Sequence, residues 1–378
     1  MTDHRGQMLE QRRDSLKGLY IHIPFCEAIC TYCDFTKRIP KNREMVDDYI
    51  DELIRELGSY RDHFASIDTV YIGGGTPSML SVEQMDRLFR VLEPIEPVEY
   101  TIEVNPESYT FEKGERFKAF GINRVSLGVQ TFDPVLLSTL NRKHRPEDVD
   151  AAIRHLNGIG IERISLDMIY AIPGQTLDSL EKDLDGLKRL DVPHVSYYSL
   201  ILEEKTVLYD RYRKGEIALV ENDLEARMYE RVIAFLTARG YEHYEISNFA
   251  KPGMQSVHNT LYWTHSEYIG CGLGAHGYLD GTRYQNATRL SDYRRPWIKE
   301  AHETTMDERL SDELIFGLRR LEGVDLERIE RDYGIDPFRR YPELKSVVKE
   351  GLVEVCDGRL RLTKKGLFYG NQVFMVFI

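Results

Sequence analysis

Three cysteines near the start of the chain, Cys26, Cys30 and Cys33, follow one another with the spacing C-x3-C-x2-C. Thiolates held this close together can bind a metal centre. A structural zinc site takes four protein ligands, and a [4Fe–4S] cluster usually takes one thiolate for each iron. Three cysteines therefore leave one iron of a cluster open, and an open coordination position is where a further ligand can bind and react.

Other interpretations of the three cysteines have to be compared with an iron–sulfur cluster. Disulfides are disfavoured, because the five cysteines of the chain are an odd number and residues 1–17 lack the apolar stretch of a secretory signal. Zinc could use His22 as a fourth ligand, although zinc sites more often contain paired C-x2-C motifs. Three unrelated core cysteines are the remaining option. Cys271 and Cys356 are isolated, and we expect both to be ordinary apolar residues.

The overall composition limits the kind of protein this can be. With 378 residues, 42% hydrophobic and 30% charged, the chain is expected to form one large domain and a small one. A net charge of −12 argues against binding to nucleic acid. No apolar run approaches the length of a membrane span. We therefore expect a cytoplasmic protein with no transmembrane segment; peripheral membrane contact and a homodimer stay open.

The elements that must position the cysteines alternate between short β-branched segments and amphipathic helices. Six strands are predicted at Leu19–Ile23, Thr69–Ile72, Glu99–Val104, Arg124–Val129, Arg163–Met168 and His194–Ser199. The helices predicted between them include Val46–Leu57, Val82–Leu92 and Leu177–Leu190. This alternation predicts parallel strands joined by right-handed crossovers. The predicted fold class is α/β, with a partial (βα)6 barrel of the TIM type.

The carboxyl ends of the predicted strands carry polar or glycine residues, and in a parallel barrel these ends form the active site. The first strand leads into the cysteines, and the others end near Gly73-Gly74-Gly75-Thr76, Glu103, Gln130, Asp167, and Tyr197-Tyr198. Glycines after a strand let the backbone approach a ligand closely, so carbonyl oxygens there could hold an amino group. Six such ends in succession predict a single cavity.

The remaining sequence divides into a less regular part and a small C-terminal domain. Residues 201–305 contain a predicted helix at 223–239 and a segment rich in aromatic residues, histidine and glycine. After residue 306, helices (312–321 the first) precede the strands Val353–Cys356 and Arg359–Leu362, and Asp357-Gly358 between them is typical of a type I′ hairpin. This order indicates a winged-helix-like α+β domain. Its thirteen Lys/Arg against fourteen Asp/Glu from residue 307 onward make DNA binding a poor interpretation.

The predicted domains are therefore a polar N-terminal segment (1–18), a core barrel (19–200), a barrel extension (201–305) and the C-terminal domain (306–378). The last six residues, Val373–Ile378, are nearly all apolar. We expect them to pack as a terminal strand or onto another domain.

A histidine stands beside two large aromatic residues in His258-Asn259-Thr260-Leu261-Tyr262-Trp263. Histidine is a common axial ligand of haem iron, and aromatic side chains suit a flat apolar ligand. A single histidine in an aromatic segment is more often a hydrogen-bonded core residue, and His265 and His276 are nearby alternatives. The glycines at 272–277 spell G-x-G-x-x-G, but a predicted turn and strand follow, so the motif is not a dinucleotide site.

The sequence Tyr20-Ile21-His22-Ile23-Pro24-Phe25-Cys26, the cysteine spacing and the strand-end residues resemble the radical S-adenosylmethionine (SAM) superfamily. Within it, the chain is similar to the HemN/HemW group from Leu19 onward. That group contains oxygen-independent coproporphyrinogen III dehydrogenases (HemN), oxidase-like relatives and HemW haem chaperones. The resemblance implies that Cys26, Cys30 and Cys33 ligate three irons of a [4Fe–4S] cluster, with SAM bound to the fourth.

The resemblance also implies the residues that bind the cofactors. SAM would be contacted by Tyr20, Tyr32, Gly74, Gly75, Thr76, Glu103, Gln130, Arg142 and Asp167. Arg142 fits a carboxylate partner, since guanidinium groups make bidentate pairs with carboxylates. Electron transfer from the cluster would cleave SAM to methionine and a 5′-deoxyadenosyl radical. The motif of His258, Asn259, Tyr262 and Trp263 would bind haem.

Two departures from the dehydrogenase pattern separate the subfamilies. The dehydrogenase has a fourth cysteine where this chain has Phe35, and it has an N-terminal extension for which the position of Cys26 leaves no room. Both favour a haem chaperone that transfers haem to haem-dependent proteins, with respiratory proteins as the expected acceptors. The alternative is the dehydrogenase, which decarboxylates propionate side chains oxidatively in porphyrin biosynthesis. Whether SAM is cleaved is left open, and no residue is assigned as catalytic.

Overall fold

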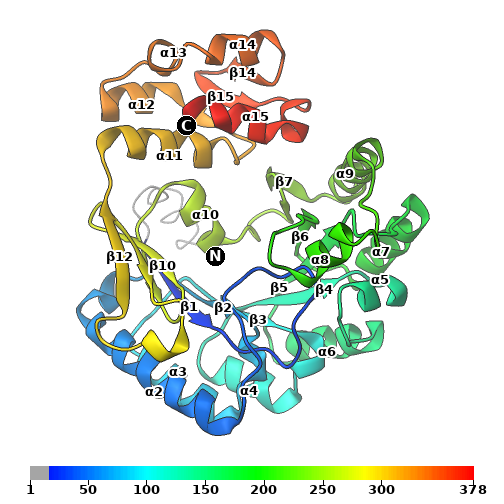
Figure 1. Ribbon diagram of the computed structural model, residues 1–378, viewed down its shortest axis with the longest axis vertical. Helices are drawn as coiled ribbons and strands as arrows, with labels where there is room; N and C mark the ends of the chain where they lie inside the picture. The colour runs from blue at the N-terminus through cyan, green and yellow to red at the C-terminus, as the bar shows by residue number, and fades with distance from the viewer. Residues whose placement is uncertain (1–16) are drawn as a thin grey trace, which may run out of the picture.

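The computed structural model of the chain describes residues 17–378 and contains two sheets (Figure 1). The large sheet has the strand order β12-β11-β10-β9-β1-β2-β3-β4-β5-β6-β8-β7, and the small sheet has the order β13-β15-β14. Most of the predicted N-terminal segment, residues 1–16, lies outside the described residues. No helix among residues 17–378 is long and apolar enough to cross a membrane.

Six parallel strands form the centre of the large sheet in sequence order, as predicted. They are β1 (Gly18–Ile23), β2 (Thr69–Gly74), β3 (Glu99–Val104), β4 (Arg124–Gln130), β5 (Arg163–Tyr170) and β6 (His194–Ser199). Their alternating side chains explain the two faces of the sheet. In β1, Leu19, Ile21 and Ile23 are fully buried in the hydrophobic core, while Tyr20 and His22 point to the opposite face. The α/β barrel prediction is confirmed.

The segment after β6 extends the sheet at both edges, where the sequence predicts little regular structure. At one edge, β9 (Tyr268–Cys271) pairs parallel to β1, and β10 (His276–Leu279), β11 (Thr282–Asn286) and β12 (Ile298–Glu303) continue antiparallel. At the other edge, β7 (Glu242–Glu245) and β8 (Asn248–Ala250) follow β6. The curved wall around the barrel interior is therefore wider than six strands.

Helices cover the outer side of this wall (Figure 1). They are α2 (Arg43–Ser59), α3 (Val82–Leu92), α4 (Phe111–Ala119), α5 (Pro134–Thr139), α6 (Pro146–Gly158) and α7 (Leu177–Leu190), and α8 (Val207–Arg213) and α9 (Asn222–Thr237) follow β6. Helix α3 shows why they form. Ser81 and Gln84 make a capping box at its start, and the buried Leu88, Phe89 and Leu92 occupy one face.

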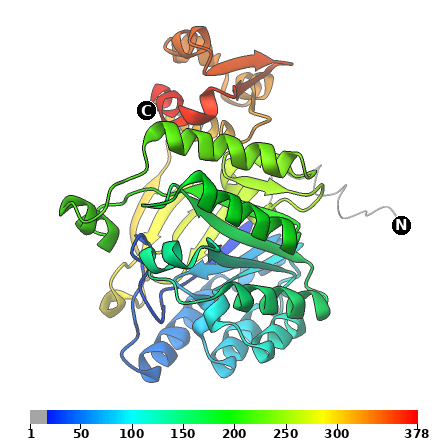
Figure 2. The same cartoon turned by 90° about the vertical axis from the view of Figure 1, so that its right-hand side faces the viewer.

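The C-terminal residues lie above α10 (Val257–Trp263) and α9, on the side of the molecule opposite α2, α3 and α4 (Figure 1 and Figure 2). They comprise α11 (Met306–Gly317), α12 (Leu326–Tyr333), α13 (Pro337–Arg340), α14 (Leu344–Lys349), α15 (Gly370–Phe374), β13 (Val324–Asp325), β14 (Val353–Cys356) and β15 (Arg359–Leu362). Asp357 and Gly358 have φ angles of 51° and 75°, which confirms the type I′ hairpin. Tyr229 of α9 packs edge-on against Phe368, with 5.4 Å between ring centroids.

Two sequence predictions about this region are wrong in detail. The first helix begins at Met306 rather than 312, because Thr305 and Glu308 make a capping box. The chain end is helical rather than a strand: Val373, Phe374 and Phe377 join the hydrophobic core of the C-terminal part itself. A six-residue apolar run does not by itself separate a short strand from a buried helical turn.

Candidate functional site

The cysteine loop follows β1 directly and is tied to the rest of the barrel by backbone hydrogen bonds. The Cys26 amide donates to Arg38 O (3.0 Å), and the Thr31 amide donates to Leu140 O (3.1 Å). The thiols of Cys26, Cys30 and Cys33 are all free. Burial raises the pKa of Cys26, and it raises the pKa of Cys33 to about 11. A positive centre such as iron would favour release of the protons from Cys26 and Cys33.

The structure does not support the zinc interpretation. Both ring nitrogens of His22 are engaged, Nδ1 with the Tyr20 hydroxyl at 2.9 Å and Nε2 with Thr36 O at 2.7 Å. Within residues 17–378, no group of three His, Cys, Asp or Glu side chains converges on a point where one metal ion could sit. A single zinc ion needs such convergence, whereas the thiolates of a cluster bind separate irons. The donor set therefore suits a cluster better.

The glycine run at the end of β2 lies directly against the cysteine loop. The Gly75 amide donates to Ile23 O at 2.8 Å. A Cβ atom at Gly75 would lie 2.8 Å from Phe25 O and 3.0 Å from Cys26 Sγ, which is too close for any other residue. At Gly74, φ is +111° and a Cβ would meet the His22 ring at 2.5 Å. These glycines bring the backbone next to the cysteines.

Two carboxyl groups from β3 and β5 face the barrel interior beside the glycine run. Glu103 accepts from the Gly74 amide (3.0 Å) and the Tyr71 hydroxyl (2.8 Å), and Asp167 accepts from Ser126 Oγ (2.8 Å). Burial raises the pKa of Glu103 to about 7, with the Asp167 charge adding to it, and raises the pKa of Asp167 to about 6. Such carboxyls favour a ligand that brings a positive charge, which an amino or sulfonium group does.

Arg142 lies beside the cysteine loop, and its buried guanidinium is held by three groups. Nη2 donates to Gly128 O (2.7 Å) and faces Glu107 Oε2 (3.3 Å), and Nη1 is 3.8 Å from Cys30 Sγ. A small cavity at this point is lined by Glu27, Ala28, Cys30, Thr76, Asn105, Glu107, Ser108, Asn141, Arg142 and Lys143. The structure thus brings Cys30, Thr76 and Arg142 together, as the sequence predicts. The sequence motifs do not identify Glu107 as a site residue, although Glu107 follows the end of β3 by only three residues.

Two other predicted SAM contacts lie close to this region but do not line the cavity. Gln130 ends β4 with φ of +66°, a conformation that a residue other than glycine seldom adopts. Tyr32 packs beneath the cysteine loop against a small apolar cluster that includes Leu140 and Ile172. Strained backbone at the end of a barrel strand is common at binding sites, so Gln130 remains a candidate.

His258, the predicted haem ligand, is fully buried at 0% exposure in α10 (Val257–Trp263). Its Nδ1 is hydrogen-bonded to Thr69 Oγ1 at 2.8 Å and its Nε2 to the Tyr262 hydroxyl at 3.0 Å. Burial lowers the pKa of His258 to about 3, so the ring is neutral. In this arrangement both ring nitrogens of His258 are hydrogen-bonded and neither is free for iron.

A column of aromatic rings runs from His22, near the end of β1, to α10. The Tyr20–Tyr71 and Tyr71–His258 pairs are stacked, whereas the first pair of the column is tilted and the last is edge-on. Ring centroids are 6.0 Å apart for His22 and Tyr20, 6.1 Å for Tyr20 and Tyr71, 5.1 Å for Tyr71 and His258, and 5.4 Å for His258 and Tyr262. Tyr71, in the middle of the column, also donates to Glu103, so this one residue contacts both the proposed SAM site and the haem motif.

The other members of the haem motif are only partly buried. Asn259 donates its backbone amide to Ser256 Oγ at 3.3 Å. The Arg319 guanidinium lies over the Trp263 ring, 4.4 Å from its centroid, and the indole nitrogen of Trp263 is buried without a hydrogen-bond partner among the described residues. The alternative His265 stacks on Tyr278 at 4.7 Å, and His276 is exposed.

The start of α10 is fixed by Glu99, a residue that the sequence did not single out. The carboxylate of Glu99 is fully buried and accepts from Ser256 Oγ (3.2 Å), the Val257 amide (3.1 Å) and the His258 amide (2.9 Å). Arg124 Nη1 faces it at 3.5 Å. Glu99 therefore holds the helix that carries the haem motif against the barrel.

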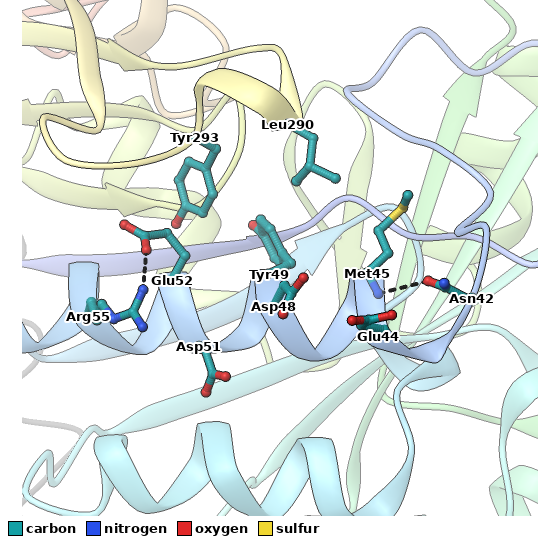
Figure 3. Close-up of a pocket in the computed structure, with 10 residues that line it drawn as sticks. All are labelled: Asn42, Glu44, Met45, Asp48, Tyr49, Asp51, Glu52, Arg55, Leu290 and Tyr293. Carbon is teal, nitrogen blue, oxygen red and sulfur yellow. Dashed lines mark hydrogen bonds and ion pairs between the residues drawn. The ribbon is translucent and has the colours of Figure 1, made fainter.

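A separate cavity of about 580 Å³ lies over α2, away from the cysteines (Figure 3). Its lining includes the acidic residues Glu44, Asp48, Asp51 and Glu52 of α2, and Tyr293; the Asp51 side chain points away from Tyr293 (Figure 3). The sequence-predicted site residues do not line it, so it is distinct from the candidate site.

Comparison with known proteins identifies the class of protein to which this fold and site belong. Residues 20–187 match the Radical SAM superfamily model, and residues 305–369 match the HemN C-terminal domain. The solved structure of coproporphyrinogen III oxidase (HemN) from Escherichia coli, a radical SAM enzyme, has a TM-score of 0.83 at 25% identity, covering 98% of this chain and 92% of its own. The barrel and its cysteine loop are those of the radical SAM superfamily, which implies a [4Fe–4S] cluster and SAM.

Similarity over nearly the whole chain narrows this class. Heme chaperone HemW of Bacillus subtilis is 40% identical over 377 residues, covering 96% of this chain and 99% of its own. HemW of Lactococcus lactis is 39% identical, with 95% and 96% covered, and that of Escherichia coli is 30% identical, with 96% and 98% covered. The chain belongs to the HemW haem chaperone family.

Proposed function

We propose that this protein binds haem and transfers it to haem-dependent proteins, among them respiratory proteins, in the cytoplasm. The observation that supports this most is the similarity to HemW chaperones along almost the entire chain. Phe35 agrees with it, because this side chain is 65% exposed at the edge of the cysteine loop where the dehydrogenase pattern has a fourth cysteine. Five free cysteines suit a reducing compartment.

In the proposed cofactor site, Cys26, Cys30 and Cys33 hold the cluster and leave one iron for SAM. A bound cluster with SAM supplies an electron and a source of the 5′-deoxyadenosyl radical. The chain itself supplies the charges that orient SAM. Glu103 faces a positive amino group and Arg142 faces a carboxylate, while the glycines at 74 and 75 allow close backbone contact.

In the proposed haem site, His258 is the iron ligand and Asn259, Tyr262 and Trp263 surround the macrocycle. Since His258 is buried and both of its ring nitrogens are hydrogen-bonded, haem binding includes a displacement of α10. The helix has seven residues and Glu99 holds its start, so the proposed displacement breaks the hydrogen bonds to Glu99.

Haem titration of the purified protein tests the function. Wild type and the His302→Ala control, which changes an exposed histidine of β12, should show a Soret band with the same midpoint. His258→Ala should weaken binding at least tenfold. No haem binding by the wild type would contradict the chaperone function. Equal affinity in His258→Ala would remove His258 from the site and leave the function standing.

The structural similarity to HemN supports one alternative, oxidative decarboxylation of coproporphyrinogen III propionates. An anaerobic assay with the reconstituted cluster would then yield protoporphyrinogen. SAM cleavage without a decarboxylated tetrapyrrole would exclude this activity.

A further inference from the structure

We propose that Glu107 is a positioning residue that occupies the Arg142 guanidinium when SAM is absent, and that binding of the SAM carboxylate displaces it. The proposal rests on the proposed SAM site and adds a residue that controls its affinity. Glu107 lies in the 3₁₀ turn Pro106–Ser108 directly after β3, at the rim of the small cavity beside the cysteine loop.

Glu107 and Arg142 form an ion pair that is looser than an ideal one. The distance from Arg142 Nη2 to Glu107 Oε2 is 3.3 Å, whereas charge-assisted hydrogen bonds of this type usually measure about 2.7–2.9 Å. Only one oxygen of Glu107 takes part. A carboxylate that reaches two guanidinium nitrogens would therefore bind Arg142 better than Glu107 does.

Of the two partners, Glu107 is the one that can leave. The side chain of Arg142 is 4% exposed and that of Glu107 is 23% exposed. Arg142 is also fixed from behind, because Nη2 donates to Gly128 O at 2.7 Å and Nη1 lies 3.8 Å from Cys30 Sγ. When a ligand enters the cavity, the Arg142 guanidinium is therefore already in position, and Glu107 is the side chain that moves.

Arg142 keeps an unused donor for such a ligand. Its Nε is buried and has no hydrogen-bond partner among residues 17–378. A buried guanidinium N–H without a partner is costly, and it is satisfied when a second carboxylate binds side-on. Nε is thus the donor that Glu107 leaves unpaired and a bidentate carboxylate would use.

His144 gives Glu107 a second contact in the same place. The His144 side chain is 1% exposed, and its Nδ1 lies 3.5 Å from the Glu107 oxygen that faces Arg142. Glu107 therefore lies between Arg142 and His144, which both follow α5. With SAM bound and Glu107 still in place, two carboxylates would crowd one guanidinium, and this repulsion weakens SAM binding.

SAM affinity of the cluster-loaded protein tests the proposal. Equilibrium dialysis with labelled SAM compares wild type, Glu107→Gln, Glu107→Ala and the control Glu112→Gln, which changes an exposed acid in the first turn of α4. Both Glu107 variants should bind SAM about tenfold more tightly at equal iron and sulfide content, and the control should match wild type. Decarboxylated SAM, which lacks the carboxylate, should show no such gain.

Arg142→Gln separates the inference from the proposed site. If this variant weakens SAM binding while the Glu107 variants bind SAM no better than wild type, the positioning role is overturned and the site stands. A gain with decarboxylated SAM equal to the gain with SAM also overturns it. If Arg142→Gln leaves SAM affinity unchanged, Arg142 is not the carboxylate partner, and the proposed site itself fails.

Discussion

Replacing Glu99 with glutamine should release α10 from the barrel. In the native arrangement the Glu99 carboxylate accepts three hydrogen bonds from the first residues of α10 and faces the guanidinium of Arg124. An amide keeps the shape of the side chain but has one oxygen acceptor and no charge. The N-terminus of α10 then loses acceptors, and Arg124 stays buried with no carboxylate opposite it.

The size of the effect follows from these contacts. Glu99 and Arg124 both lie in barrel strands, so the loss of their pairing affects the barrel whether or not α10 is docked. The opening of α10 depends on the hydrogen bonds from its first residues, and a hydrogen bond to a charged group contributes about 1.5–3 kcal/mol. We expect the free energy of opening α10 to fall by about 3 kcal/mol. At 1.4 kcal/mol per factor of ten, amide hydrogen exchange in α10 should become about 100-fold faster.

Hydrogen exchange measured by mass spectrometry on peptides that cover 256–264 and β3 provides the assay. Glu96→Gln, which changes an exposed acid three residues earlier, is the matched control and should exchange like wild type. The variant should also take up haem faster, since α10 opens more often. Unchanged protection of α10 in Glu99→Gln, with faster exchange only in the barrel strands, would refute the role assigned to Glu99.

Three further changes test other parts of the structure. Gly75→Ala should lose most of the cluster iron and sulfide, because its Cβ would lie 2.8 Å and 2.9 Å from two backbone oxygens, whereas Gly58→Ala, in open space, should keep them. Cys33→Ser should lose the cluster absorbance and Cys356→Ser should keep it. Burial raises the pKa of Glu56 from 4.5 to about 7, so the folded chain holds a proton that the unfolded chain releases, and stability falls as pH rises from about 4.5 to 7. The free energy of unfolding, measured with denaturant at pH 5 and pH 8, should show this loss of about 3 kcal/mol in wild type but not in Glu56→Gln. The same pH dependence in both proteins would contradict the prediction.

Local sequence patterns predicted the six parallel strands and the residues at their ends. Each strand is a short β-branched run followed by a turn signal, and these signals act over a few residues. The parallel partner of β1 at the other edge, β9, could not be predicted. It has four residues, and its pairing with β1 joins segments about 250 positions apart, as in Gly18 with Tyr268. Tertiary contacts of this range leave no periodic signal.

The state of His258 could not be predicted either. A histidine between polar and aromatic residues fits both an iron ligand and a core residue. The outcome depends on Thr69 and Glu99, which lie 189 and 159 positions away and fix the ring and the backbone of His258. Similarly, Glu107 becomes notable only when the fold places it against Arg142, because an acid after a strand is common in any α/β chain.

The aromatic column has a thermodynamic consequence. Displacing His258 from Tyr71 uncovers the tyrosine that donates to Glu103, and Glu103 in turn accepts from Gly74 at the end of β2. Suppose a ligand binds Glu103 with different affinities when α10 is docked and when it is open. Binding of that ligand must then change the equilibrium between the two positions of α10 by the same factor. A ligand held by Glu103 and a haem that displaces His258 would then change the affinity for one another by the same factor.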